Sequence, residues 1–318
     1  MEAIYRNYLE RLASLMAVSL TNWIPIEWSS EALQRVSQNS AVETYARAFN
    51  MTTDTQRVLR SLGADVGTGG TYTDDSSVND YVLLDAVKFT GQFKIDEDDL
   101  SDADSVINTI SVKSTDWATS YAVAFDNSCL AVTAAANGTT VPFTSVYKTV
   151  RTNGETGEGY TADDNYVAYN GTASAAYDQL SSVVAKVEQG LYFNSSRALV
   201  VAHNAFRAVF RGAKDTSGMP IFIQGIAGTP DTLFGIPVAW SNGAKTSATR
   251  SAAPAGNPVL VVVGDTDALM RGDRLSPEAL VDRARAHDST DQTALKLRVR
   301  KAFEVSHPAA VAVLEKTA

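Results

Sequence analysis

The first 53 residues alternate short helical patterns with breaks and carry no clear strand. Apolar positions recur at helical spacing over residues 2–18, which predicts a short amphipathic helix. The apolar positions are Ile4, Tyr8, Leu12 and Leu15. A weaker helical pattern covers residues 29–38. Because no turn returns this segment onto a domain, we expect residues 1–53 to form an extended arm.

Residues 54–95 have a glycine-rich centre between two stretches with strand character. Gly63, Gly67, Gly69 and Gly70 punctuate the centre, and apolar and polar positions partly alternate over 86–95. This pattern predicts a long β-hairpin with a flexible tip rich in Gly, Asp and Ser. A two-stranded hairpin is at best marginally stable alone in water, so we expect it to lie against another surface.

The strongest helical pattern follows the hairpin. Ser101 and Asp104 have the spacing of a capping box, with aspartate in place of the usual Glu or Gln. Apolar residues then recur at helical intervals as far as Val132. They include Val106, Ile110, Trp117, Tyr121 and Phe125. A helix of roughly 30 residues spans about 45 Å, and we expect Trp117 and Tyr121 on its buried face.

The centre of the chain, residues 141–264, mixes short strands and helices. The predicted helices cover 175–188 and 204–211. The predicted strands cover 198–202, 235–240 and 258–264, with a loop rich in small residues at 242–257. The mixture predicts a compact α+β region.

The chain ends in a regular alternation that predicts long strands. Leu295, Leu297, Val299, Phe303 and Val305 occupy one face, and the opposite face is polar. The polar face carries Lys296, Arg298, Arg300 and Glu304. This pattern is typical of an antiparallel sheet that is packed on one side only.

Composition favours a folded chain and argues against several functions. The 318 residues are 45% apolar and 20% charged, with a net charge of −9 that opposes binding to phosphates. A single cysteine, Cys129, gives neither a disulfide nor a CxxC motif. No apolar run is long enough for a membrane span. The N-terminus lacks the pattern of a signal peptide, so we expect cytoplasmic synthesis.

Charge is distributed unevenly along the sequence. Residues 54–104 hold 12 acids and 4 bases, a net charge of −8, whereas residues 271–301 hold 8 bases and 5 acids, a net charge of +3. We therefore hypothesise that hairpin acids of one copy pair with basic residues of the next. The acids are Asp74, Asp75 and Asp80, and the bases are Lys296, Arg298 and Arg300. The alternative is that both are ordinary solvated surfaces.

Motifs for catalysis, cofactors or metals are missing from the sequence. The stretch 63–70 lacks the Gly-Lys-Ser/Thr ending of a phosphate loop, and no Gly-x-Ser-x-Gly elbow occurs. His203, His287 and His307 lie on different predicted elements. The acidic run from Asp96 to Asp104 has carboxylates that suit a hard cation, but a helix N-terminus on a solvated face is the favoured interpretation. We expect no catalytic, cofactor or metal residues, and no enzyme.

Several local strings, in this order, resemble those of HK97-like major capsid proteins of tailed phages. Residues 93–102 resemble the passage from the extended E-loop into the spine helix, and 124–127 resemble the stretch near the end of that helix. Residues 207–218 and the Gly-Ile-Pro-Val sequence at 235–238 resemble a central segment of the family. Residues 297–310 resemble its closing strands.

The resemblance implies an HK97-like capsid fold with four parts. These are an N-terminal arm (1–53), an E-loop hairpin (54–95), a P-domain with spine helix and long terminal strands (96–140 and 265–318) and an A-domain (141–264). It further implies that the chain forms pentamers and hexamers of an icosahedral virion shell around double-stranded DNA, after synthesis in a bacterial host. A portal protein and decoration proteins are the implied partners.

Two departures from the family pattern change the expectations. No scaffolding extension of the family's kind precedes the arm, so we expect that either a separate scaffold protein or the arm itself does that job. The family's covalent cross-link needs an E-loop lysine, whereas Lys88 lies near the hairpin base; we expect no cross-link.

Two other functions remain open at this stage. An encapsulin, a cellular compartment with the same fold, differs by its cargo and genome neighbours, because fold does not fix function. A soluble enzyme of unknown class is the second alternative, and the absence of nucleophile, metal and phosphate motifs counts against it. A compact 34.0 kDa monomer under every condition would argue against the capsid interpretation.

Overall fold

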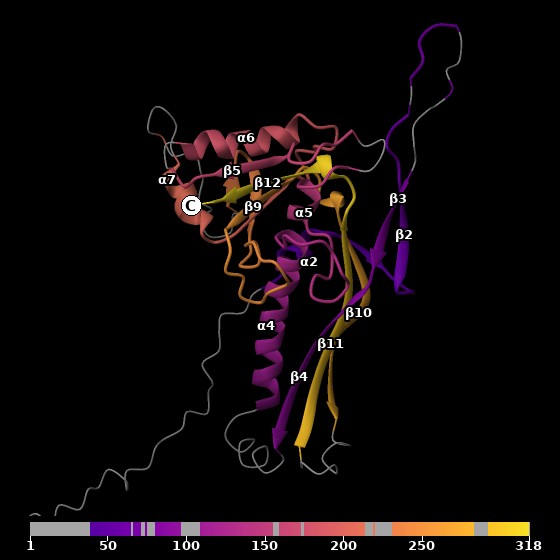
Figure 1. Cartoon of the computed structure of the whole chain (residues 1–318), viewed down its shortest axis with the longest axis vertical. Coiled ribbons are helices and arrows are strands. Elements are labelled where there is room, and N and C mark those ends of the chain that lie inside the picture. Colours follow the sequence, from indigo (N-terminus) through magenta and orange to yellow (C-terminus); the bar gives the residue numbers. More distant parts are fainter. Residues whose placement is uncertain are drawn as a thin grey trace, which may run out of the picture.

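The structure is a computed structural model that describes residues 39–64, 66–70, 74, 80–96, 109–154, 159–172, 175–213, 219, 231–282 and 292–317. The expected arm helices and the capping box at Ser101 lie outside these residues. Figure 1 shows a globular region built on one sheet and, beside it, a long narrow sheet that runs along a single helix. Among the described residues, no helix has the length and apolar character to cross a membrane.

The narrow sheet has four strands in the order β1-β10-β11-β4. The strands are β1 (Arg47–Asn50), β10 (Leu269–Asp282), β11 (Gln292–Val305) and β4 (Val87–Asp96). β11 pairs antiparallel with both β10 and β4, and β1 runs parallel to β10. Burial along β11 confirms the predicted alternation: Leu295, Leu297 and Val299 are buried, whereas the basic residues between them are partly exposed.

Helix α4 (Thr109–Leu130) packs along this sheet, as the sequence pattern predicted. Tyr121 and Phe125 are buried, and their rings lie 5.5 and 6.0 Å from the ring of Phe89 in β4. Trp117 is half-buried rather than fully buried, because it lies at the margin of the core, one turn before Tyr121 in the helix. Its ring stacks on that of Tyr121.

The second sheet has six strands in the order β5-β12-β9-β6-β8-β7. Its strands are β5 (Tyr166–Tyr169), β6 (Leu199–Ala202), β7 (Thr232–Leu233), β8 (Ile236–Trp240), β9 (Val259–Val263) and β12 (Val311–Lys316). Helices α6 (Ala176–Glu188) and α7 (Phe206–Gly212) contribute to its core. These bounds confirm the helices and strands predicted for the centre of the chain.

The last strand, β12, corrects the expected extent of the P-domain. The resemblance places residues 265–318 in the P-domain, but β12 lies between β5 and β9 in the six-stranded sheet. A short turn at Pro308–Ala310 separates it from β11. Val311, Val313 and Leu314 are all fully buried, because a central strand is covered on both faces, unlike the one-sided β11.

The hairpin consists of β2 (Thr55–Arg60) and β3 (Asp80–Asp85), paired antiparallel. β4 was expected to be one of the two hairpin strands, but it joins the four-stranded sheet through ten paired positions with β11. Phe89 explains this choice, because its side chain reaches the main core when β4 lies beside β11. The hairpin therefore ends at Asp85, not at residue 95.

Candidate subunit-contact site

The hairpin has a covered face and an uncovered face. Val82 and Leu84 point toward the narrow sheet and are buried against Met270 and Ala302. On the other face, Leu59 is 88% exposed, Tyr81 44% and Leu83 42%. Leu59 pairs with Tyr81 across the strands. An uncovered face of large apolar side chains is typical of a surface that binds another molecule.

A cation lies over this uncovered face. The guanidinium carbon of Arg57 is 4.6 Å from the centre of the Tyr81 ring, within cation–π range. Arg57 also pairs with Leu83 across the two strands. The outer face of the hairpin, defined here as Arg57, Leu59, Tyr81 and Leu83, is thus apolar with one positive charge.

Arg60 fastens the end of the hairpin to the sheet. It forms an ion pair with Asp80 at 2.9 Å and donates from Nη1 to the carbonyl oxygen of Ser306 at 2.6 Å. A hydrogen bond from the Tyr81 amide, together with Arg60, lowers the pKa of Asp80 below its usual value. Asp80, one of the predicted contact residues, is therefore held within its own chain.

The predicted bases lie on the polar face of β11, as expected, but Arg298 and Arg300 form ion pairs within their own chain. Arg298 forms an ion pair with Glu278 of β10 at 2.8 Å. Arg300 forms one with Asp54, just before the hairpin, at 3.0 Å. Lys296 shares this polar face and is partly exposed. Among the described residues, no ion pair joins Lys296, Arg298 or Arg300 to Asp74 or Asp80.

The other predicted acids lie in or next to the parts of the chain outside the described residues. Asp74 is exposed, and Asp75 lies outside the described residues. Asp96 ends β4, and the rest of the acidic run to Asp104 lies outside the described part. Within the described ranges, no group of three His, Cys, Asp or Glu side chains is placed to hold a metal ion.

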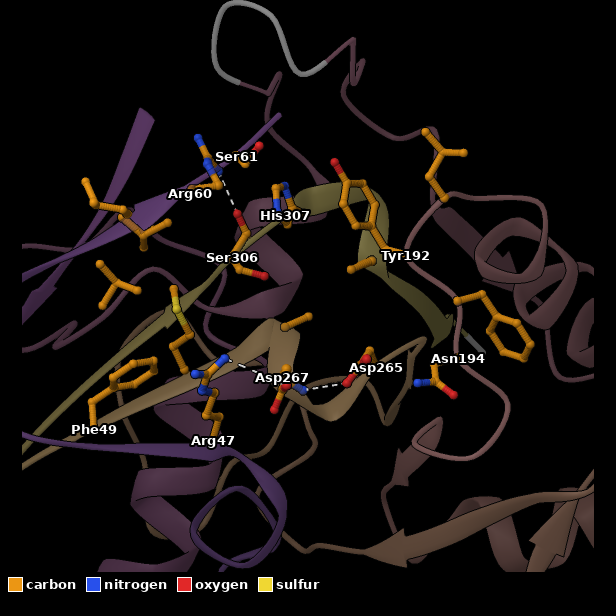
Figure 2. Close-up of a pocket in the computed structure, with 18 residues that line it drawn as sticks. Arg47, Phe49, Arg60, Ser61, Tyr192, Asn194, Asp265, Asp267, Ser306 and His307 are labelled. Atoms are coloured by element: carbon orange, nitrogen blue, oxygen red, sulfur yellow. Dashed lines mark hydrogen bonds and ion pairs between the residues drawn. The ribbon is translucent and has the colours of Figure 1, made fainter. Parts of the chain in front are cut away.

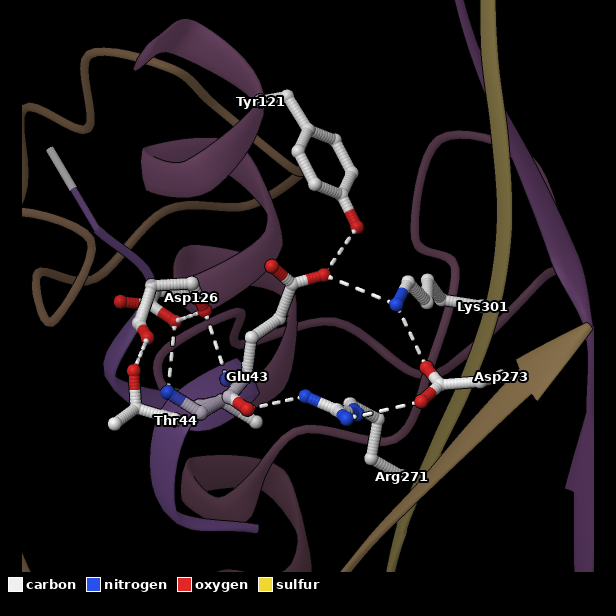
Figure 3. A network of polar contacts seen from close by, with 9 residues as sticks. Glu43, Thr44, Tyr121, Asp126, Arg271, Asp273 and Lys301 are labelled. Carbon is white, nitrogen blue, oxygen red and sulfur yellow. Dashed lines mark hydrogen bonds and ion pairs between the residues drawn. The ribbon is translucent and has the colours of Figure 1, made fainter. Parts of the chain in front are cut away.

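A second cluster fixes the place where the arm joins the body (Figure 3). Asp126 of α4 is fully buried and accepts hydrogen bonds from four donors. The donors are the Ser40 hydroxyl, the Ala41 and Val42 amides and the Ser241 hydroxyl. The amides of Ala41 and Val42 are the first two of helix α2 (Ala41–Tyr45), so the carboxylate caps that helix. Burial raises the pKa of Asp126.

Asn127, the next residue of α4, joins this helix to the loop 241–251. Its amide nitrogen donates to the carbonyl oxygens of Gly243 at 3.1 Å and Lys245 at 2.7 Å. Its carbonyl oxygen accepts from Ser247 at 2.8 Å and the Ser251 amide at 3.0 Å. All the hydrogen-bonding capacity of this buried amide is used, which fixes the end of α4 to the six-stranded region.

Ion pairs complete the junction between the arm and the narrow sheet. Lys301 of β11 is buried and contacts Glu43 at 3.3 Å and Asp273 at 2.7 Å. Glu43 accepts from the Tyr121 hydroxyl at 3.0 Å, and Arg271 pairs with Asp273 at 2.9 Å (Figure 3). Burial, reinforced by the Glu43 carboxylate, raises the pKa of Tyr121 far above its usual value.

A cleft of about 430 Å³ separates β2 from the loop at residues 191–194 (Figure 2). Two rings at its wall, Tyr192 and His307, stack with centroids 4.2 Å apart. Burial, and secondarily Arg60, lowers the pKa of His307 to about 4. Across the cleft, Arg47 lies 3.8 Å from Asp267. The hairpin is thus separated by open space from the six-stranded region on its β2 side.

Sequence reasoning located the polar face of β11 but missed most of its partners. The alternation of Lys296, Arg298 and Arg300 with apolar residues was enough to place them on one face. Glu278 and Asp54 carry no local signal, because their pairing depends on which strand lies beside β11 and where the hairpin begins. The alternation over residues 55–60 could have indicated the outer face of the hairpin.

Solved structures that are similar to this chain include structures from a GTA particle and from phages. The capsid of a native GTA particle matches with a TM-score of 0.70 at 18% identity, covering 95% of this chain and 98% of that chain. Structures from Mycobacterium phage Bobi (TM-score 0.67, 15% identity, 94% and 97% covered) and Microbacterium phage Oxtober96 (0.66, 14%, 94% and 97%) match similarly. A comparison with curated proteins finds no match.

The fold is therefore the HK97-like capsid fold. A family model described as the Phage capsid family matches residues 21–316, and the chain belongs to that family. It is a major capsid protein, a structural subunit of a bacteriophage shell that is built from many copies of itself. The encapsulin alternative is not favoured, because the structural matches reported above are phage and phage-like particles.

Proposed function

We propose that copies of this chain are held together by the hairpin of one subunit lying on the polar face of β11 of the next. The uncovered outer face of the hairpin carries this proposal: Leu59, Tyr81 and Leu83 are exposed on an element whose other face has only a small core. Repeating such a contact between two different surfaces builds a ring when the rotation between neighbouring copies closes.

In this contact, charge determines how the two surfaces are aligned more than how tightly they bind. Arg298 and Arg300 already have acidic partners in their own chain, and exposed ion pairs contribute only about 0–1 kcal/mol each. Burial of the outer face supplies the affinity, at roughly 25 cal/mol per Å² of apolar surface. The negative charges of Asp74, Asp75 and Asp80 favour approach to the basic side of β11 over other surfaces.

The shell that results is an icosahedral virion capsid of pentamers and hexamers that encloses double-stranded DNA without reading its sequence. The net charge of −9 supports enclosure rather than tight phosphate binding. The chain is synthesised in the cytoplasm of a bacterial host, and its further partners are a portal protein, a separate scaffold protein and decoration proteins. The chain acts by assembly, not as an enzyme.

A pair of variants tests the contact. Leu59→Ser changes an 88% exposed side chain, so the subunit should fold as the wild type does but form few shells in sedimentation and electron microscopy. Asp74→Lys with Asp75→Lys should misdirect assembly, and exchange of Lys296, Arg298 and Arg300 for glutamate should partly restore it. Asp178→Lys with Glu188→Lys on α6 changes the net charge equally and should assemble normally. Normal shells from both hairpin variants would show that the outer face is ordinary solvated surface.

A further inference from the structure

Among the described residues, a narrow strip of apolar contacts and the hydrogen bond from Arg60 to the Ser306 carbonyl attach the hairpin to its own subunit. The buried side chains are Met51, Val82, Leu84, Met270 and Ala302. The cleft of about 430 Å³ lies on the β2 side of this strip, and a second cleft of about 610 Å³ lies on the β3 side. An element that is held along a narrow strip, with open space on both sides, can rotate about that strip as about a hinge.

A carboxyl group lies beneath this pivoting element. Glu304 is on the same polar face of β11 as Ala302, pairs with Met270 of β10, and lines the second cleft together with Tyr81 and Leu83. Its only hydrogen bond among the described residues is a long one, 3.4 Å, from the amide of Val305. No cation of the described residues forms an ion pair with it.

The charged groups around Glu304 do not compensate for its burial. Arg60 of β2 is engaged by Asp80 and the Ser306 carbonyl. Asp85 of β3 repels a negative charge at Glu304. Lys148 lies across the second cleft, and His307 follows on the same chain segment with a pKa of about 4, so it is neutral above that pH.

We propose that Glu304 is a proton-dependent latch for the hairpin: the neutral carboxyl allows the hairpin to lie on β11, and ionisation favours its release. The physical reason is desolvation, since a carboxylate covered by the hairpin loses hydration that it regains when the hairpin pivots away. The latch operates within one chain and stands whether or not the hairpin binds a second copy.

The direction of the pH dependence follows from the carboxyl group. Burial, opposed by Arg60 and reinforced by Asp85, raises the pKa of Glu304 to about 7, compared with 4.5 for the solvated group. The docked hairpin therefore binds more protons than the released one between these values. Docking is strongest below pH 4.5, weakens as the pH rises, and reaches its lowest strength above pH 7.

Hydrogen exchange on the full chain tests the latch. Protection factors, in which the intrinsic pH dependence of exchange is divided out, are measured for peptides that cover β3 and the Ala86 amide, which donates to the Asp54 carbonyl. From pH 5.5 to 8 they should fall by at least about tenfold in the wild type and stay constant in Glu304→Gln. The matched control is Glu278→Gln, which removes an ion-paired carboxyl group of β10 and should keep the wild-type pH dependence.

A second variant keeps the test valid if Glu304→Gln does not fold. Asp85→Asn removes the repulsion, so the midpoint of the pH dependence should move to lower pH. A wild-type protection factor that does not change with pH would overturn the proposal. A dependence that persists in Glu304→Gln, or a midpoint that Asp85→Asn leaves in place, would overturn it as well.

Discussion

The indole of Trp117 in α4 lies directly against the backbone of Gly91 in β4, where a larger residue would place its own side chain. A Cβ atom at Gly91 would come within 2.3 Å of the indole nitrogen of Trp117. Glycine at this place in β4 is therefore required by the close approach of the helix rather than by the geometry of the strand.

Gly91→Ala should lower the free energy of unfolding by about 1–3 kcal/mol, because the added methyl group displaces a stacked indole. Chemical denaturation measures the change. Gly212→Ala is the control, because a Cβ atom there meets nothing within 4 Å. In the background of Trp117→Ala, the cost of Gly91→Ala should nearly disappear. Additive costs in this double-mutant cycle would show that the contact does not set the packing.

Asp126→Asn should destabilise the subunit by roughly 2–4 kcal/mol, because an amide group would turn a donor toward the hydroxyl and amide groups that now donate to the carboxylate. The measurement is denaturant unfolding. Asp116→Asn on the same helix is the matched control and should change stability by less than about 0.5 kcal/mol. Equal stability of the two variants would contradict the role assigned to Asp126.

Gly272→Ala should detach the base of the hairpin. A Cβ atom there would come within 2.3 Å of the Met51 sulfur and 2.9 Å of the Ala302 methyl group. We expect a loss of about 1–3 kcal/mol and faster hydrogen exchange at the Met51 amide, which donates to Asp273. Met51→Ala should partly restore stability by making room. No rescue would mean that the clash lies at Ala302 instead.

Glu315 should make the subunit sensitive to acid. Burial opposes its ionisation, but hydrogen bonds from Asn257, Tyr166 and Tyr147 outweigh burial and lower its pKa. Its contribution is complete above about pH 4.5, the value of the solvated carboxyl group, and is lost as the pH falls through the lower pKa of the folded state.

Glu315→Gln tests this contribution, because its amide group cannot accept all three bonds. The variant should be about 2–4 kcal/mol less stable than the wild type at pH 7, and the difference should shrink as the pH falls below 4.5. Urea unfolding across this range measures it. Glu188→Gln, an exposed carboxyl group at the end of α6, should show no such change. A difference that is independent of pH would assign the effect to packing.

Local patterns in the sequence determined most individual elements. The spacing of Tyr121 and Phe125 predicted the buried face of α4, and the alternation from Leu295 to Val305 predicted a strand with one polar face. The periodicity of burial appears in the spacing of apolar residues that are close in the sequence. Such elements can therefore be predicted without the fold. The placement of Lys296, Arg298 and Arg300 on that polar face could be predicted for the same reason.

Tertiary structure alone decided which elements lie together. Whether β4 pairs with β3 or with β11, and whether β12 extends the narrow sheet or enters the centre of the other one, depends on contacts between residues more than 100 positions apart. Arg300 and Asp54 meet only because the hairpin begins over the sheet, and Asp126 reaches Ser241 only because the loop 241–251 folds onto α4. A side-chain pattern specifies that a residue is buried, but the identity of its partner is set by the packing of distant segments.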